Sequence, residues 1–120
     1  MDTTALRAKT EELLAAGKKI TFRWDCGNDE ALVYMSIDGK EVNYSDPVYE
    51  NLSSSFDEYL CEYLDLPSAG EFSLEGLASI EKRDDGIYIV FVNVTKGYAD
   101  ETGEWQEVNE EERDEVKLFE

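Results

Sequence analysis

Apolar and polar residues alternate strictly over residues 20–25. Ile20, Phe22 and Trp24 occupy the apolar positions, and polar residues lie between them. Side chains of a strand point alternately to the two faces of a sheet, so the pattern predicts a strand with one buried face. A second strand is predicted over residues 31–37, an apolar run that ends at the turn formers Asp38-Gly39, and residues 41–44 are expected to pair briefly after it.

A longer hairpin is predicted over residues 72–94, with Asp85-Gly86 as its turn signal. Its second strand begins with an almost continuous apolar run. Such a run is typical of a central strand that is covered on both faces. We therefore expect Ile89 and Phe91 to be fully buried.

Two helices are predicted from apolar positions three and four residues apart. The first covers residues 3–16, with Thr3 or Thr4 as its N-cap and Gly17 in the left-handed position after its C-terminus. Its apolar stripe is narrow, so it should lie on the surface of a sheet.

The second helix has its apolar positions between residues 48 and 63, and its start is ambiguous. Pro47 after Asp46 is a favourable beginning. A capping box formed by Ser55 and the Glu three residues later is the alternative. The Pro and Gly of residues 67–70 are expected to end the helix in either case.

These elements predict a single α+β domain over residues 1–120. The predicted architecture is an antiparallel sheet of four to six strands with two helices packed on one face, in the approximate order α-β-β-α-β-β. An acidic C-terminal element, residues 99–120, is expected to dock on this sheet. Its apolar residues, which would make the contact, are Trp105, Val108, Val116, Leu118 and Phe119.

The net charge of −18 is the most distinctive property of the composition. The chain has 29 Asp and Glu residues, 11 Lys and Arg residues and no His. Residues 1–60 carry twelve acids and six bases (net −6), whereas residues 61–120 carry seventeen acids and five bases (net −12). Such a field repels phosphates and anionic lipids, so we expect neither direct nucleic-acid binding nor membrane binding. The charge either provides solubility or meets a basic partner.

The acids are most concentrated in residues 99–115, which contain nine of them. If residues 100–115 were helical, they would span about 24 Å and carry one acid per about 2.7 Å. That density is of the order of duplex DNA, which carries one charge per about 1.7 Å, so nucleic-acid mimicry enters the hypothesis. The residues that we expect to contact a partner are Asp100, Glu101, Glu104, Trp105, Glu107, Glu110, Glu111 and Asp114.

Recognisable catalytic or cofactor motifs are absent from the sequence. Without His, and with Cys26 and Cys61 as its only cysteines, one chain cannot supply a tetrahedral Cys/His zinc site. We interpret both cysteines as small, half-buried hydrophobic residues, although their number permits a disulfide. Residues 25–30 offer three carboxylates and an amide, which suit a cation, a tight connection between strands or a contact with a partner. No cofactor, metal or catalytic activity is expected.

The sequence therefore favours a binding function. We expect a small acidic protein that occupies a basic surface of a nuclease, toxin or other nucleic-acid-handling protein, as an inhibitor or immunity factor. The alternatives are a small cation- or ligand-binding domain, a hydrolase, or an acidic soluble domain of no deducible activity. The polar N-terminal residues lack the apolar core of a signal peptide, which predicts a cytoplasmic location.

Overall fold

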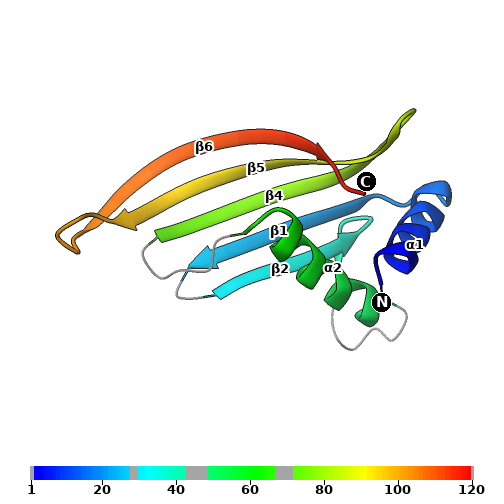
Figure 1. Ribbon diagram of the computed structural model, residues 1–120, viewed down its shortest axis with the longest axis horizontal. Coiled ribbons are helices and arrows are strands. Elements are labelled where there is room, and N and C mark those ends of the chain that lie inside the picture. Colours follow the sequence, from blue (N-terminus) through cyan, green and yellow to red (C-terminus); the bar gives the residue numbers. More distant parts are fainter. Residues whose placement is uncertain (1, 28–29, 43–48, 67–71, 120) are drawn as a thin grey trace.

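The computed structural model describes residues 2–27, 30–42, 49–66 and 72–119. Its elements in chain order are α1 (Thr3–Ala15), β1 (Ile20–Gly27), β2 (Glu30–Ile37), β3 (Lys40–Glu41), α2 (Glu50–Tyr63), β4 (Phe72–Arg83), β5 (Gly86–Ala99) and β6 (Trp105–Lys117). The six strands form one sheet in the order β3-β2-β1-β4-β5-β6, and neighbouring strands are antiparallel. Both helices lie on the same side of the sheet (Figure 1), which confirms the predicted α+β architecture.

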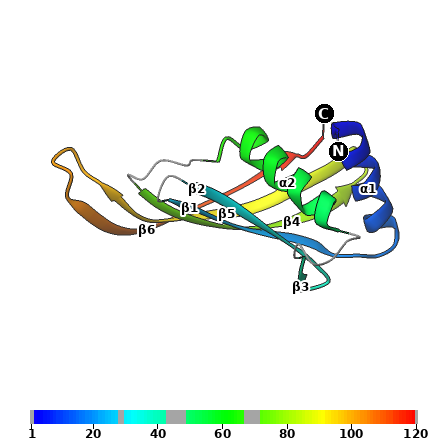
Figure 2. The ribbon, with the colours of Figure 1, turned by 90° about the horizontal axis from the view of Figure 1, so that it is seen from below.

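The alternation of β1 defines the two faces of the sheet. Ile20, Phe22, Trp24 and Cys26 are buried on the face that carries the helices, and we call this face, with the residues paired to them, the helix face. Thr21, Arg23 and Asp25 point the other way, and with their paired residues they form the open face. Figure 2 shows both helices on one side of the curved sheet and neither on the other.

Helix α1 begins at Thr3, the first residue of its predicted range, but its N-cap lies before both predicted caps. Asp2 is the N-cap, and its Oδ1 accepts a hydrogen bond from the Ala5 N–H at 2.8 Å. The prediction of Thr3 or Thr4 is therefore wrong, because the carboxylate of Asp2 already supplies the acceptor. Gly17 has φ +77° after the helix, as expected for this position.

Helix α2 begins at Glu50, after Tyr49, which makes no side-chain capping bond. Ser55 lies inside the helix, so the predicted capping box does not form, and the alternative start at Asp46-Pro47 lies outside the described residues. The helix ends at Tyr63, and the Pro and Gly predicted to end it lie at residues 67–70, outside the described residues. Asp65 adopts φ +50°, and the Leu66 N–H donates to the carbonyl of Cys61 at 3.0 Å. This is the Schellman arrangement, with Asp in the position that Gly usually occupies.

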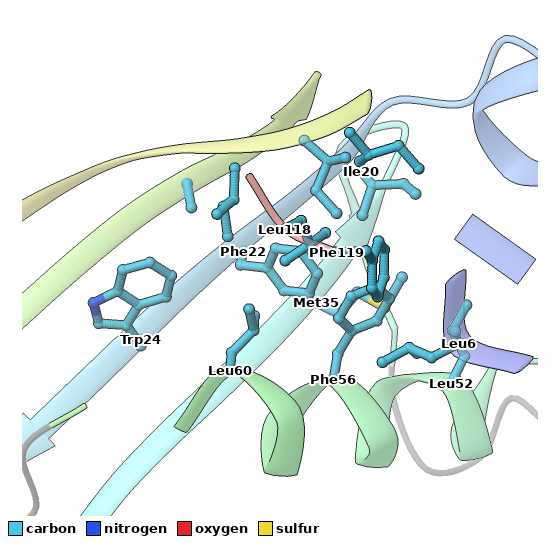
Figure 3. Packing of buried hydrophobic residues seen from close by; sticks show 14 of the residues in the cluster. Leu6, Ile20, Phe22, Trp24, Met35, Leu52, Phe56, Leu60, Leu118 and Phe119 are labelled. Atoms are coloured by element: carbon cyan, nitrogen blue, oxygen red, sulfur yellow. The ribbon is translucent and has the colours of Figure 1, made fainter. Parts of the chain in front are cut away.

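The core lies between the helix face and α2 (Figure 3), and the end of the chain closes it. The rings of Phe22 and Phe56 are 4.9 Å apart. Leu118 and Phe119, which follow β6, are fully buried in the same cluster. The Tyr59 hydroxyl donates to the carbonyl of Leu118 at 2.6 Å and so ties the C-terminal segment to α2.

Strand β5 is covered on one face only. Ile89 is fully buried, as predicted, but Phe91 is only partly buried, so the prediction for Phe91 is wrong. The strand lies next to the edge, and its open-face residues Val90 and Val92 have no element above them. The continuous apolar run therefore reflects one core face and one partly exposed apolar face.

Both tight turns come close to their predicted positions. Asp38 and Gly39, with φ of +54° and +82°, connect β2 to β3 as expected. In the long hairpin, Arg83 pairs with Gly86, so the turn residues are Asp84 and Asp85, one position earlier than predicted. A register shift near Gly97 marks a bulge in the β5–β6 pairing.

The indole of Trp24 crosses the sheet over a glycine. Trp24 pairs with Gly76, which in turn pairs with Asn93. The Nε1–H of Trp24 donates to Oδ1 of Asn93 at 2.7 Å, so the ring must pass above Gly76. A Cβ atom at that position would lie 1.9 Å from Nε1, which leaves no room for any residue except glycine.

We expect Gly76→Ala to lower the free energy of unfolding by about 1–3 kcal/mol, because the added methyl group overpacks the site. The matched control is Ser79→Ala, on the open face of the same strand, which should change stability by less than about 0.5 kcal/mol. In a Trp24→Phe background the nearest atom is gone, so the penalty of Gly76→Ala should shrink. Denaturant unfolding of the four variants measures this coupling, and a parent-like Gly76→Ala protein would contradict the packing.

Candidate functional site

The acidic C-terminal segment forms β6, an edge strand of the sheet, and not a helix. Its 13 residues span about 43 Å at about 3.3 Å per residue. The strand contains six acids, so it carries one per about 7 Å, whereas duplex DNA carries one charge per about 1.7 Å. The charge density is therefore well below the value that a helix would give.

The segment docks on the domain mainly through its last residues. Leu118 and Phe119 are buried, and Val116 and Val108 are partly buried. Trp105 is 50% exposed. The β5–β6 hairpin extends past the neighbouring ends of β4, β1 and β2 (Figure 1), so its far end lies away from the core.

Strand alternation divides the acids of β6 between the two faces. Glu110, Glu112 and Asp114 lie on the helix face, and we call these three residues the acidic ladder. Their partners on β5 are the uncharged residues Thr95, Asn93 and Phe91. Within the part of the chain that the structure describes, no ladder carboxylate forms an ion pair.

The acids on the open face of β6 have basic neighbours. Glu111 lies 2.8 Å from the guanidinium of Arg113. Glu115 binds both terminal nitrogens of Arg83, at 3.0 and 2.9 Å, and this contact lowers the pKa of the Glu115 carboxyl. The two faces of one strand therefore differ in charge, because the acidic ladder is unbalanced and the opposite row is partly neutralised.

Asp100 holds the turn of the hairpin. Its Oδ1 accepts hydrogen bonds from the backbone N–H groups of Thr102 and Glu104 and from the Thr102 hydroxyl, at 2.6 to 3.0 Å. Its Oδ2 accepts from the Gln106 amide at 3.0 Å. These donors lower the pKa of Asp100, the Thr102 hydroxyl most of all. The carboxylate, predicted as a partner contact, is thus committed to the turn.

Trp105 packs on the backbone of its neighbouring strand. A Cβ atom at Gly97 would lie 2.4 Å from Cζ2 of Trp105, so the ring covers the glycine. Half of the side chain is still exposed. Trp105 therefore presents an ordered aromatic surface at the far end of the hairpin.

The structure divides the predicted contact residues among three places. Glu101, Glu104 and Glu107 are exposed in or near the turn, beside Trp105. Glu110 and Asp114 lie in the acidic ladder, and Glu111 lies on the opposite face. Glu112, absent from the predicted set, stands between Glu110 and Asp114. These three residues are two positions apart in the sequence. Had this segment been predicted as a strand, the spacing would have placed Glu112 on the same face as Glu110 and Asp114.

The two cysteines are free and unreactive in character. Cys61 is partly buried, as predicted, with its Sγ 3.8 Å from the Ala31 carbonyl. Cys26 is fully buried, so the prediction of half-burial is wrong for this residue. Burial, with smaller contributions from Cys61 and Asp25, raises the pKa of Cys26 to about 11. Burial, followed by the Asp57 carboxylate, also raises the pKa of Cys61. Both environments disfavour the nucleophilic thiolate.

The possible cation ligands of residues 25–30 are distributed over two strands. Asp25 lies on the open face of β1, Glu30 begins β2, and residues 28–29 lie outside the described part. The described residues contain no group of three or more Cys, Asp or Glu side chains placed to hold a metal. None of the described helices has the length and apolar character needed to cross a membrane.

The raised pKa of Cys26 makes stability fall in alkaline solution. The ordinary pKa of the thiol is 9.0, whereas that of the folded thiol is about 11. Its contribution is complete below pH 9 and is lost as the pH rises toward 11. Between these values the parent should lose up to about 1.4 kcal/mol per pH unit more than Cys26→Ala, which lacks the group. Denaturant unfolding under reducing conditions measures both slopes, and equal slopes would contradict the assigned environment.

The unbalanced acidic ladder also makes stability depend on salt. Neighbouring ladder residues are about 6.8 Å apart along the strand, and the Debye length falls from about 30 Å at 0.01 M salt to about 8 Å at 0.15 M. We expect the melting temperature to rise with NaCl over this range, and to rise less when Glu110, Glu112 and Asp114 are replaced by their amides. Calorimetry tests this; a flat or falling parent curve would show that the carboxylates do not repel one another.

Comparison of the chain with protein-family models, with curated proteins and with solved structures gives no match. The geometry and charge of the β5–β6 hairpin are therefore the observations from which a function is proposed.

Proposed function

We propose that the protein binds a basic surface of another protein through the acidic β5–β6 hairpin, as an inhibitor or immunity factor. The observation that carries this proposal is the acidic ladder, because Glu110, Glu112 and Asp114 line one face of a projecting strand and are paired with uncharged residues of β5. The proposed setting is the cytoplasm, and the proposed partner is a nuclease, toxin or other nucleic-acid-handling protein. The protein would act by occupying a site, without catalysis or cofactor.

The ladder suits recognition because the strand sets a regular spacing between the backbone positions of its three acids. Its neighbours lie within one Debye length of each other at physiological salt, so they repel in the free protein. Lys and Arg side chains of a partner would relieve this repulsion. The negative field of the ladder also attracts a basic protein over a distance. This attraction raises the association rate more than it raises the affinity.

Trp105 would supply an apolar contact with the partner, in addition to the charges of the acidic ladder. Aromatic residues dominate the binding energy of protein interfaces, whereas exposed charges at the rim contribute mainly to the rate of encounter. The ring is already held on Gly97, so little side-chain freedom would be lost on binding. The acids of β6 are too widely spaced to imitate the charge density of a nucleic-acid duplex closely. Their spacing therefore favours recognition of a protein surface over nucleic-acid mimicry.

The position of β6 favours a second role for the same acids. An edge strand presents unpaired backbone groups that can add a strand from another molecule, and charged side chains oppose such pairing. β6 is a long edge of the sheet, whereas the opposite edge strand β3 has two residues. In this alternative the acids prevent aggregation and mark no partner.

A triple reversal distinguishes the two roles. Glu110→Lys, Glu112→Lys and Asp114→Lys together should slow association with the partner by at least tenfold and flatten its salt dependence. The control is Glu12→Lys, Glu58→Lys and Glu62→Lys on the helices, which changes the net charge equally. Partners are first captured from the native host at low salt, and association is then measured by surface plasmon resonance.

If the ladder variant and the helix control associate with the partner at equal rates, the slower association follows from net charge alone and the acidic ladder is not the binding surface. If no basic protein is captured by the parent, or if the ladder variant captures it unchanged while aggregating more readily, the edge-protection role replaces the proposed one.

A further inference from the structure

The open face of the sheet carries apolar side chains that nothing in the described structure covers. Leu77 is 65% exposed and Leu32 is 42% exposed, and both lie on this face. Val90, Val92 and Val94 of β5 lie beside them and are partly buried. Figure 2 shows neither helix on this side. Exposed apolar residues gathered on one face of a sheet mark an interaction surface.

The sheet register arranges the open face into rows that cross five strands. One row, the arginine row, consists of Tyr34, Arg23, Leu77, Val92 and Arg113. The adjacent row, the carboxylate row, consists of Leu32, Asp25, Glu75, Val94 and Glu111. The first row has two positive charges and no acid, and the second has three negative charges and no base.

We infer that the open face binds a second copy of this chain, with a two-fold axis that runs across the strands between the two rows. Such an axis places each row against the other row of the second copy. Arg23 then faces Asp25 of the second copy, Arg113 faces Glu111, and Tyr34 faces Leu32. On the two strands between them, Val92 faces Val94 and Leu77 lies opposite Glu75. Every pair forms twice, as an isologous interface requires. The strands of the two sheets run nearly antiparallel, which is the aligned mode of sheet packing.

The charges of the open face make this association possible for a chain of net charge −18. Arg23 stacks on Tyr34, with the guanidinium 4.4 Å from the ring centre. Within the described ranges, neither Arg23 nor Lys96 forms an ion pair. They border a hollow of about 390 Å³, whose lining also includes Glu75, Leu77 and Val92. The hollow offers space for side chains of the second copy, and its two bases outnumber its one carboxylate.

The two rows cover five strands about 4.8 Å apart and two positions about 6.8 Å apart along the strands, or roughly 330 Å² of sheet on each copy. The total places this association at the small end of protein interfaces, where binding is weak and depends on protein concentration. The acidic ladder and both helices lie on the other face, so this association leaves the proposed partner-binding surface free and does not depend on it.

Sedimentation velocity at 0.15 M salt tests the inference over a hundredfold range of protein concentration. The parent should reach twice the chain mass, and Leu77→Asp should remain a monomer with an unchanged melting temperature. Asp25→Arg should raise the dissociation constant at least tenfold, because two arginines then face each other in each pair. Its control, Glu58→Arg on α2, reduces the net charge equally and should not weaken association.

The double exchange Arg23→Asp with Asp25→Arg identifies the axis. It restores both pairs with their directions reversed, so the dissociation constant should return to within about threefold of the parent value. A parent that stays monomeric at every concentration overturns the inference. Dimers that tolerate Leu77→Asp, or that the double exchange fails to restore, overturn it as well, because they would use another surface or another axis.

Discussion

The register of the sheet depends on the contact between Trp24, Gly76 and Asn93. The indole can reach Asn93 only by lying flat over a residue without a side chain, and Gly76 is that residue. A slip of one position in β4 would bring Glu75 or Leu77 beneath the ring and would exchange the two faces of the strand. The core and both surface rows would then be lost together, since each is defined by the same pairing. One partly buried hydrogen bond and one glycine thus help to determine which side chains are available for recognition.

The C-terminal strand combines a surface that repels itself with an anchor that holds it in place. The six acids of β6 repel one another, and this repulsion would weaken the pairing of β6 with β5 if nothing else held the strand to the domain. Leu118 and Phe119 enter the core directly after it, and Tyr59 binds the carbonyl of Leu118. Burial of a large apolar side chain contributes about 1.5–3 kcal/mol, which exceeds the fraction of a kcal/mol typical of exposed charge pairs. The anchor therefore allows the strand to display charges that it could not otherwise keep together.

Much of the fold is predictable from the sequence, because periodicity reports directly on burial. The alternation at Ile20, Phe22 and Trp24 predicts β1, and the spacing of Leu52, Phe56 and Leu60 predicts the buried side of α2. The acidic segment is different. Its acids obscure both the period of two and the period of 3.6, so nothing in residues 105–115 distinguishes a strand from a helix. The division of Glu110 and Glu111 between opposite faces follows only from pairing with β5, a contact between distant parts of the chain. Phe91 misleads for a related reason, because its apolar neighbours predict burial but do not show that β5 lies next to the edge strand, where Phe91 is paired with Asp114.

The two faces of the sheet are suited to different kinds of recognition. On the helix face of β6, charges of one sign are aligned without relief, and such a field acts over a distance and selects only for opposite charge. On the open face, arginines and carboxylates alternate between adjacent rows around exposed apolar side chains. That pattern has little net field at a distance and becomes favourable only when a matching surface is in register. A chain of net charge −18 can approach another copy of itself only through such a balanced region. The few bases of the sheet are placed unequally: Arg23 and Arg113 lie on the open face, and none lies in the acidic ladder. One small sheet can therefore carry a charge-balanced face and a row of unbalanced acids.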